Sequence, residues 1–535
     1  MRLALSAAIT LAFFSNGFVD ESIEATLYQG ESVQDRSNQV AFMTYVLSPD
    51  QERKAAVLID SIRTFAGIYS EAPIYVALGD PEGIPCESLA GAGVILVPLP
   101  QDKAALNYLY GVKPLACAEV EKLTSGKFRT LIYLDPESLV LAQPDAMILD
   151  GAHKVSIRPV HLVNNIGQAP SEPVDGFWGP IYREAGVDPA SVPVVETVVD
   201  VKKVRAYYCC IIMSVRPEEG ICGEWLRIFR DRLNDTVYQK EACGDFLHRV
   251  FLHQATLCGV INAKAKPDEI VIPPLAYTYP LGLSDRIPEE KRVSKLSEIV
   301  TAAMEQLWDN DPSWMDKLDP DDAHKAWVRQ AYIKYYKVTD NIFRKEGSCN
   351  TYLVVTPAGS VVIDPGGAPE PAGPLLSLTQ SAPLKTILLT HAHTDHNGGY
   401  EVWNLEKTIP VIAQREHAEF IRYHQRLAGF FAARDAVQGN VASINDEAEI
   451  AATVLFADEH AFELGGFHFN IYHTPGETPD TSTIWIPELK AAFVGDNYYT
   501  SFPNLSPPRG SKPRWALDFV NSLEKILSLE PEMVF

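Results

Sequence analysis

The 535-residue chain lacks any apolar run of about eighteen residues, the shortest length typical of a membrane-spanning helix. It also lacks an excess of positive charge, because 46 lysines and arginines stand against 69 acidic residues, a formal net charge of −23. This charge argues against nucleic acid or an anionic membrane as the main partner. The sequence has no internal repeat and no low-complexity tract, and its length allows two or three domains.

Cysteine is scarce and follows no diagnostic pattern. None of the eight cysteines forms a CxxC pair, and seven of them precede residue 260. Export would permit disulfides, but their pairing cannot be read from sequence. Buried free thiols are the alternative to bridges.

The N-terminus resembles a targeting segment. Met1-Arg2 gives a short positive region, Leu3–Phe14 is mostly apolar, and Ser15-Asn16-Gly17 offers small residues for cleavage. We therefore predict a signal peptide over residues 1–17 and a secreted or periplasmic protein. The alternative is an uncleaved first strand or a frayed tail. Residues 18–38 are mostly polar and predict a flexible lead-in.

The most informative segment carries three imidazoles and one carboxylate, at His391, His393, Asp395 and His396. It follows the β-branched apolar run 386–389, which predicts a buried strand. On a tight loop at a strand end, the first two histidines are expected to point one way and the other two residues the opposite way. Zinc favours imidazole nitrogen and carboxylate oxygen, so this spacing predicts two metal ions that share one water. The alternative is a polar loop with chance histidines.

The pattern His-x-His-x-Asp-His resembles the metallo-β-lactamase superfamily, whose other motifs follow in order. Asp364 ends an early predicted strand, His473 begins a His-Thr-Pro-Gly motif, and Asp496 stands in the place of the bridging ligand. The resemblance covers roughly residues 338–535. It implies an αββα fold and a dinuclear zinc site.

The resemblance also implies the ligands of each zinc ion. The first zinc is expected on His391, His393 and either His473 or Glu477; the second is expected on Asp395, His396 and the bridging Asp496. Asp395 is also our candidate catalytic residue. The metals would lower the pKa of a bound water to about 7 and so supply hydroxide to attack an ester.

The residues after His473 resemble the alkylsulfatase-like branch of the superfamily. Glu477 follows the Pro-Gly step, and Asn504 and Arg509 stand five residues apart. In that branch the glutamate can bind zinc, and the asparagine and arginine contact the sulfate. A guanidinium fork matches a tetrahedral oxyanion. The alternatives are a surface arginine at 509 and a Glu477 that only hydrogen-bonds a ligating histidine.

One expected ligand is absent from the sequence. The superfamily supplies a further histidine after a late strand, and no histidine follows His473. The segment 530–535 resembles the beginning of that strand. The simplest account is a truncated sequence, with two zinc ions per intact domain and about one for the chain ending at Phe535.

The N-terminal part predicts a separate α/β domain with a largely parallel sheet. Strands are expected at residues 41–48, 74–78 and 94–99, and the helical spacing of apolar residues predicts a helix over 51–65. Charged, helix-prone stretches over 288–337 predict a helical connector. The alternative assigns this range to one of the flanking domains.

The segment Asp135-Pro136-Glu137 ends an apolar predicted strand and resembles the DxD turn of GT-A nucleotide-sugar transferases. There the carboxylates hold a divalent cation such as Mn²⁺ or Mg²⁺ against a sugar diphosphate. The resemblance covers roughly residues 40–285, with a core strand over 207–217 and a helix from Asp245. Glu137 replaces the usual aspartate and Pro136 stiffens the turn, so we expect weak metal binding or none. The alternative is that both carboxylates cap a turn.

These patterns together predict an α/β protein with two domains. A Rossmann-like GT-A domain is expected over residues 39–287, and an incomplete metallo-β-lactamase domain over 338–535. We expect a zinc hydrolase for a small sulfate-like ester, with a phosphoester, thioester or lactone as other substrates. The alternatives are a nucleotide-sugar transferase with an accessory zinc domain and a secreted binding protein with degenerate sites. The sequence predicts no oligomeric state.

Overall fold

The computed structural model describes most of the chain in two compact units. It describes residues 38–91, 93–304, 307–308, 312–347, 349–367, 374–403, 408–437, 452–499, 503, 505 and 513–535. Unit 1 comprises Met1–Arg292 with Ile299–Ala303, and unit 2 comprises Val293–Glu298 with Met304–Phe535. The predicted signal peptide lies outside the described residues. Within the described ranges, no helix has the length and apolar character to cross a bilayer.

Unit 1 is built on a mixed sheet of seven strands, in the order β10-β6-β9-β4-β1-β2-β3. The strands are β1 (Val40–Val46), β2 (Ile74–Leu78), β3 (Val94–Pro98), β4 (Thr130–Leu134), β6 (Val155–Pro159), β9 (Tyr208–Val215) and β10 (Ile270–Val271). The four strands β1 to β4 run parallel to one another, while β9 runs antiparallel to both of its neighbours. The predicted strands at 41–48, 74–78 and 94–99 are confirmed as β1, β2 and β3.

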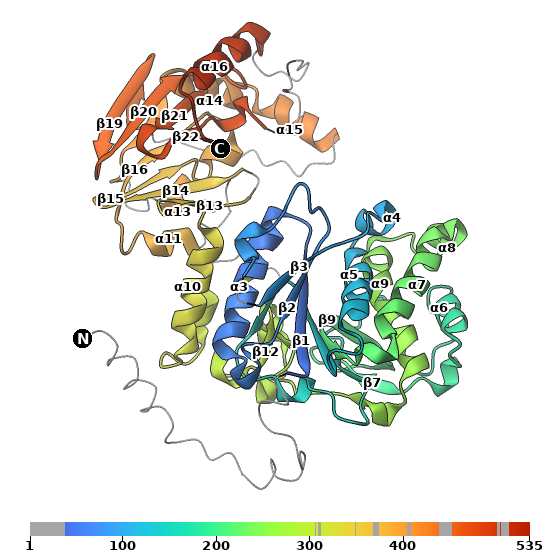
Figure 1. Cartoon of the computed structure of the whole chain (residues 1–535). Coiled ribbons are helices and arrows are strands. Elements are labelled where there is room, and N and C mark those ends of the chain that lie inside the picture. Colours follow the sequence, from blue (N-terminus) through green and yellow to red (C-terminus); the bar gives the residue numbers. More distant parts are fainter. Residues whose placement is uncertain are drawn as a thin grey trace, which may run out of the picture. The chain divides into compact units, whose positions relative to one another are not determined.

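Helices cover both faces of this sheet (Figure 1). Helix α3 (Pro49–Phe65) lies on one face, and α5 (Val112–Thr124), α7 (Ile221–Asn234) and α9 (Phe246–Lys264) lie on the other. The side chains of β1 alternate between the two cores: Phe42 packs with α3, and Met43 packs in the opposite core. Both β1 faces are therefore buried, as a central strand with helices on both sides requires.

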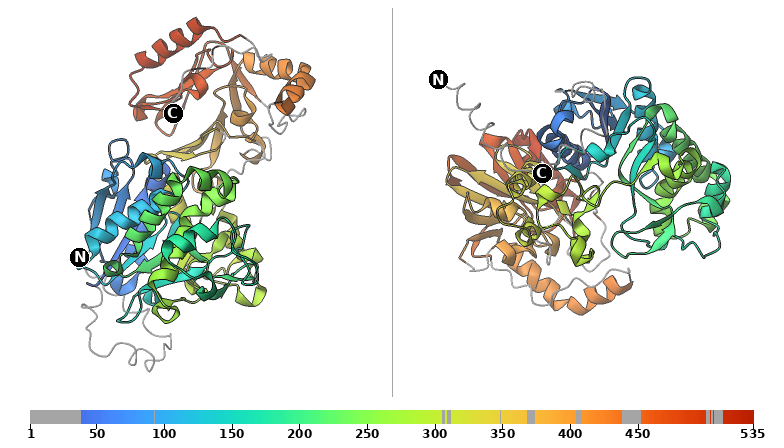
Figure 2. Two further views of the ribbon diagram at one scale, coloured as in Figure 1. Left: turned by 90° about the vertical axis from the view of Figure 1, so that its right-hand side faces the viewer. Right: turned by 90° about the horizontal axis from the view of Figure 1, so that it is seen from below.

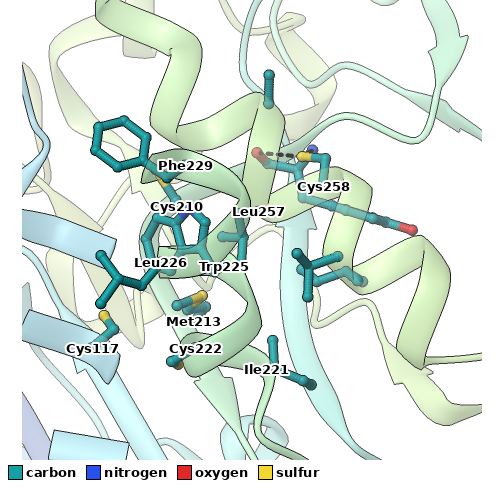
Figure 3. Packing of buried hydrophobic residues seen from close by; sticks show 14 of the residues in the cluster. Cys117, Cys210, Met213, Ile221, Cys222, Trp225, Leu226, Phe229, Leu257 and Cys258 are labelled. Carbon is teal, nitrogen blue, oxygen red and sulfur yellow. Dashed lines mark hydrogen bonds between the residues drawn. The ribbon is translucent and has the colours of Figure 1, made fainter. Parts of the chain in front are cut away.

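Buried thiols occupy the larger of these two cores. Figure 3 shows Cys117, Cys210, Cys222 and Cys258 among aromatic and aliphatic side chains of this core, which includes Trp225. None of the eight cysteines forms a disulfide, and all eight are buried. The structure thus favours the interpretation of buried thiols over disulfides.

Smaller elements complete unit 1, and one of them falls in the range predicted as a helical connector. The minor elements are β5 (Ser138–Val140), β7 (Val194–Glu196), β8 (Lys203–Arg205), β11 (Tyr279–Pro280), β12 (Thr301–Ala303), α4 (Lys103–Leu106), α6 (Trp178–Ala185) and α8 (Thr236–Glu241). Strand β12 pairs with β5 and β11 of unit 1, whereas α10 (His324–Tyr336) belongs to unit 2. The range 288–337 is therefore divided between the units and contains a strand as well as a helix.

Unit 2 contains two sheets of six and five strands. The first sheet has the order β13 (Ile342–Lys345), β14 (Thr351–Thr356), β15 (Gly359–Ile363), β16 (Leu384–Leu388), β17 (Val411–Gln414), β18 (Val454–Phe456). The second has the order β19 (Glu459–Leu464), β20 (Phe467–His473), β21 (Ser482–Ile486), β22 (Ala491–Phe493), β23 (Met533–Val534). One apolar core joins the two sheets, with Val361 and Leu388 from the first and Phe469 and Ile484 from the second.

Helices pack beside both sheets of unit 2, as an αββα architecture requires. Helices α10 and α11 (Pro374–Leu378) contact β13, and α16 (Ala516–Ser528) packs against the second sheet through Ile526, Trp485 and Val494. Figure 2 gives two further views of this unit, with its strands in yellow to red and α16 in red. Parallel pairing of β15, β16 and β17 brings the residues after these strands to one edge.

Candidate metal centre

Four strand ends of unit 2 supply the residues of the predicted metal site. Asp364 follows β15, and the histidine cluster begins three residues after β16, at His391. His473 ends β20, and Asp496 comes three residues after β22. The residues that the sequence placed in separate motifs therefore belong to loops at the ends of neighbouring strands.

The buried carboxylate of Asp364 makes hydrogen bonds to two residues of the histidine loop, Thr390 and His396. Its Oδ1 accepts the backbone N–H of Thr390 at 2.8 Å, and its Oδ2 accepts the Thr390 hydroxyl at 2.6 Å. The same Oδ2 lies 2.8 Å from Nδ1 of His396. Asp364 has a positive φ of 50°, a conformation that aspartate tolerates better than most residues. This carboxylate fixes both the histidine loop and the ring of His396, whose Nε2 is then left to face the site.

The rings of His391 and His393 meet edge to face. Nε2 of His391 lies 3.0 Å from Nδ1 of His393. Nδ1 of His391 lies 3.1 Å from the Thr390 hydroxyl, which gives its own proton to Asp364, so His391 donates from Nδ1 and keeps Nε2 unprotonated. Burial holds the pKa of His391 well below its usual value and lowers the pKa of His393 to about 4. Both rings are neutral near pH 7, the form that binds metals.

Asp496 lies between these two histidines and His396. Its Oδ2 is 3.8 Å from Nε2 of His391, and its Oδ1 is 3.3 Å from Nε2 of His396. Burial opposes ionisation of Asp496, but the hydrogen bond and charge of His396 outweigh it and lower the pKa of this carboxyl. Asp395 lies on the outer side, with its Oδ2 3.9 Å from Nε2 of His396 and a half-exposed carboxylate. The carboxylate of Asp496 therefore lies between two groups of candidate ligands, with His391 and His393 in one group and His396 and Asp395 in the other.

The structure separates the two candidates for the remaining ligand of the first metal. Nε2 of His473 lies 2.8 Å from the backbone oxygen of Pro479, so this ring stabilises its own loop. The carboxylate of Glu477 is buried and lies within the electrostatic reach of Asp496, His396 and Asp395. Burial, opposed by the nearby Arg514, raises the pKa of Glu477 to about 7. The hydrogen bond of the His473 ring and the electrostatic influence of the cluster on Glu477 favour Glu477 over His473 as the further ligand.

Two features near the site were not predicted from the sequence. Arg514 forms an ion pair with Glu477, and Nδ1 of His417 lies 2.9 Å from Oδ2 of Asp480. His417 is fully buried at the beginning of α14 (Glu416–Arg426), directly after β17. Its partner is 63 positions away, so sequence spacing gave no signal for the pair. Asn504 and Arg509, the predicted anion-binding residues, lie outside the described residues.

The donor set fits a transition-metal ion. Ligand atoms of His391, His393 and Asp496 lie within 4.8 Å of one another. One oxygen of Glu477, Oε2, is buried and has no hydrogen-bond partner in the part of the chain that is described. Buried polar atoms without partners are costly, and a cation would satisfy this one. Neutral imidazoles with carboxylate oxygens are the ligands that catalytic zinc uses.

The carboxylates predicted as a second cation site, in unit 1, are already paired with lysines. Oδ2 of Asp135 lies 2.6 Å from Nζ of the buried Lys113, and its Oδ1 accepts a hydrogen bond from the Tyr133 hydroxyl. Oε1 of Glu137 lies 2.9 Å from Nζ of Lys54. Both carboxylates are thus neutralised within the protein, which disfavours a Mn²⁺ or Mg²⁺ site here. The GT-A resemblance of unit 1 stays a prediction.

Comparison with known proteins identifies the C-terminal region. The family model of the metallo-beta-lactamase superfamily matches residues 344–535, so the chain carries a metallo-beta-lactamase domain at its C-terminus. A linear primary-alkylsulfatase of Pseudomonas sp. is 21% identical over 209 residues, 34% of this chain and 40% of the relative. The hydroxyacylglutathione hydrolase GloC of Haemophilus influenzae is 30% identical over 155 residues, 26% of this chain and 60% of the relative. Each match spans less than two thirds of the relative's own length.

Two solved structures are also similar to this chain. The sec-alkylsulfatase Pisa1 from Pseudomonas sp. is 21% identical, with a TM-score of 0.31, and the match covers 45% of this chain and 42% of that one. The protein TTHA1623, in a di-iron-bound form, is 31% identical, with a TM-score of 0.26, and the match covers 35% and 85% of the two chains. Members of the superfamily are typically hydrolases, and they usually bind metal ions.

Proposed function

We propose that the C-terminal domain is a dinuclear zinc hydrolase that cleaves a sulfate or similar anionic ester. The observation that carries this proposal is the position of Asp496, whose two carboxylate oxygens approach His391 on one side and His396 on the other. A shared carboxylate between two groups of nitrogen ligands suits two metal ions held close together.

The residues divide between two metal positions. His391, His393 and Glu477 would hold the first ion; Asp395 and His396 would hold the second; Asp496 would contact both. When bound, zinc would polarise the ester and lower the pKa of water toward neutrality. Burial keeps the imidazoles of His391 and His393 neutral near pH 7, so each has a nitrogen lone pair available to a metal ion without competition from protons.

The protein's own groups orient these ligands and receive the substrate. Asp364 holds the Nδ1–H of His396, which leaves Nε2 directed toward Asp496. A cavity of about 260 Å³ lies beside Asp395, His396 and Asp496 and includes Tyr498 in its wall. The half-exposed carboxylate of Asp395 faces this space. It is therefore placed to accept a proton from a reacting water at its Oδ2.

The substrate class rests on the alkylsulfatase-like residues. Asn504 and Arg509 would hold the charged group of the ester, because a guanidinium pairs with a tetrahedral oxyanion through two hydrogen bonds. The similarity to a linear primary-alkylsulfatase supports a sulfate ester. The similarity to a hydroxyacylglutathione hydrolase keeps a thioester as the main alternative within the same reaction class.

A transferase activity of unit 1 receives no comparable support. Its two candidate carboxylates are bound to Lys113 and Lys54 rather than open to a cation. A nucleotide-sugar transferase of the GT-A type needs those oxygens for its metal. We therefore propose the hydrolase alone.

The test is a substrate panel with the zinc-loaded full chain. Aryl sulfate, aryl phosphate, thioester, lactone and uncharged aryl ester substrates would be assayed beside the variants Asp496→Asn and Asp340→Asn. Asp340 serves as the control because its side chain is 90% exposed and lies outside the site. The proposal predicts hydrolysis of the sulfate ester that Asp496→Asn abolishes and Asp340→Asn preserves. Hydrolysis of none of the five substrates, or equal rates in Asp496→Asn and the unaltered protein, would overturn it.

A further inference from the structure

Glu477 and Arg514 form a buried ion pair at the edge of the metal centre. Nη2 of Arg514 lies 2.5 Å from Oε1 of Glu477, and the side chains are 11% and 8% exposed. Charge-assisted hydrogen bonds of this kind are the strong ones, and a planar guanidinium fixes the direction of the carboxylate that it binds. Oε1 of Glu477 is therefore held by Arg514.

The other oxygen of Glu477, Oε2, is in a different environment from Oε1. Oε2 is buried, and none of the described residues offers it a hydrogen bond. Because Arg514 fixes Oε1, the Glu477 carboxylate can bind a metal ion only through Oε2, and in a fixed direction. The charges of Asp496, His396 and Asp395 act on the Glu477 carboxyl, and the Glu477 backbone bonds the side chain of Asn497, the residue next to Asp496.

The backbone of Glu477 is held independently by the loop that carries Asp496. The Glu477 N–H donates to Oδ1 of Asn497 at 3.2 Å, and Nδ2 of Asn497 donates to the Thr474 carbonyl at 2.7 Å. A Cβ on Gly476 would lie 2.1 Å from Oδ1 of Asn497, so this approach requires glycine. Asn497 fixes the backbone of Glu477, so Arg514 determines only the rotation of the Glu477 carboxylate.

We propose that Arg514 is a positioning residue for the first metal ion, acting through Glu477. Its guanidinium holds Oε1 so that Oε2 is presented to the same ion as His391 and His393. Metal-ligating carboxylates are commonly oriented in this way, and loss of the orienting group typically costs about 10- to 100-fold in metal affinity. The inference rests on the proposed function for the existence of the metal, but it concerns metal binding rather than hydrolysis.

The sign of the expected effect separates this role from a simple charge effect. A guanidinium near a cation repels it, so an arginine acting only through its charge would weaken metal binding, and its removal would tighten binding. An arginine that contacts only the substrate would leave metal affinity unchanged and raise KM. Of these three roles, only the orientation of Glu477 predicts a loss of metal affinity when Arg514 is removed.

The experiment measures zinc affinity by chelator competition in the full chain, for Arg514→Met, Arg514→Lys and Arg422→Met. Arg422 is the control because its side chain is 66% exposed on α14. We expect the Kd of the tighter zinc to rise by about 10- to 100-fold in Arg514→Met, by less in Arg514→Lys, and not at all in Arg422→Met. The d–d spectrum of the cobalt-substituted protein should change in Arg514→Met and stay unchanged in Arg422→Met. An unchanged or lower Kd in Arg514→Met would overturn the proposal.

A double-variant cycle keeps the test valid if Arg514→Met is less stable. Arg514→Met would be compared in the unaltered and the Glu477→Gln backgrounds, because groups that act as a unit do not add. We expect Arg514→Met to add less than about a twofold loss of zinc affinity once Glu477 is altered. Full additivity would show that Arg514 acts on the fold and overturn the proposal. Intact zinc binding in a protein that hydrolyses none of the panel would contradict the proposed function and leave this inference standing.

Discussion

Nδ1 of His396 lies 2.8 Å from the carboxylate of Asp364, a residue 32 positions earlier in the chain. Burial of His396 opposes its charged form, but the Asp364 carboxylate outweighs that effect and raises the pKa of the ring well above its usual value. The contact also fixes which nitrogen faces the site. A residue that the sequence marks only as the end of a strand therefore determines the direction of a metal ligand.

Replacing Asp364 by asparagine tests this orienting role. Asparagine tolerates the positive φ at this position, so the backbone should persist while the carboxylate is lost. We expect the affinity of the second metal position to fall by about 10- to 100-fold, measured by zinc competition. Asp340→Asn, at an exposed site, should leave it unchanged. Equal zinc affinity in Asp364→Asn and the unaltered protein would contradict the assignment.

Arg509→Ala tests the predicted anion clamp. Loss of a charge-assisted hydrogen bond at a buried anion costs roughly 1.5–3 kcal/mol, which corresponds to about a 10- to 150-fold loss of turnover on anionic esters. Hydrolysis of an uncharged ester should fall much less, and zinc content should be unaffected, since Arg509 is not an expected ligand. An equal loss on charged and uncharged esters, or a loss of zinc, would show that the residue supports the fold.

Unit 1 should bind neither Mn²⁺ nor a nucleoside diphosphate in calorimetry, because Lys113 and Lys54 occupy the carboxylates of Asp135 and Glu137. Micromolar binding of a sugar nucleotide that Asp135→Ala removes would reverse this conclusion and favour the transferase.

The same variant has a second expected result, in stability. Asp135→Ala would leave the buried ammonium of Lys113 unpaired, which typically costs about 3–5 kcal/mol of unfolding free energy. Glu119→Ala is the matched control, because its partner Lys122 is 64% exposed and such pairs are worth about 0–1 kcal/mol. Urea unfolding that gives the same small loss for both variants would contradict a structural role of the buried pair.

His161 should make the stability of unit 1 depend on pH. Burial lowers the pKa of this ring to about 4, while its Nε2 lies 2.9 Å from the Thr278 carbonyl. The unfolded chain, with a pKa near 6.5, binds the proton more readily, so stability is present above about pH 6.5 and is lost as the pH falls toward about 4. The loss is about 3 kcal/mol in all. In urea unfolding of the metal-free protein, His161→Gln should flatten this decline; an unchanged decline would show that other groups cause it.

Local sequence patterns predicted the parts of the site that lie at strand ends. The runs before Asp364, His391 and Asp496 are short and apolar, and a polar ligand after such a run marks the edge of a sheet. An apolar run also predicted β1, helical spacing predicted α3, and the strand expected from the GT-A resemblance over 207–217 corresponds to β9. What they could not decide was whether His473 or Glu477 turns toward the cluster, because that depends on the hydrogen bond from the ring of His473 to Pro479.

The contacts that the sequence did not predict join residues that are far apart in the chain. Lys113 meets Asp135 from a different element, and His417 meets Asp480 across 63 positions. No spacing rule connects such residues, since only packing of the elements brings them together. The signal peptide, the secreted or periplasmic location and the roles of Asn504 and Arg509 stay predictions.

The most direct test of the account is the metal content of the purified full chain after loading with zinc and removal of excess metal. Elemental analysis should find at least one tightly bound zinc per chain, lost when His391 and His393 are both replaced by alanine and retained in Arg422→Met. Such a result would show that the buried, neutral imidazoles and the shared Asp496 form a metal centre. No bound zinc in the unaltered chain, or the same zinc content in the double-alanine variant, would contradict it.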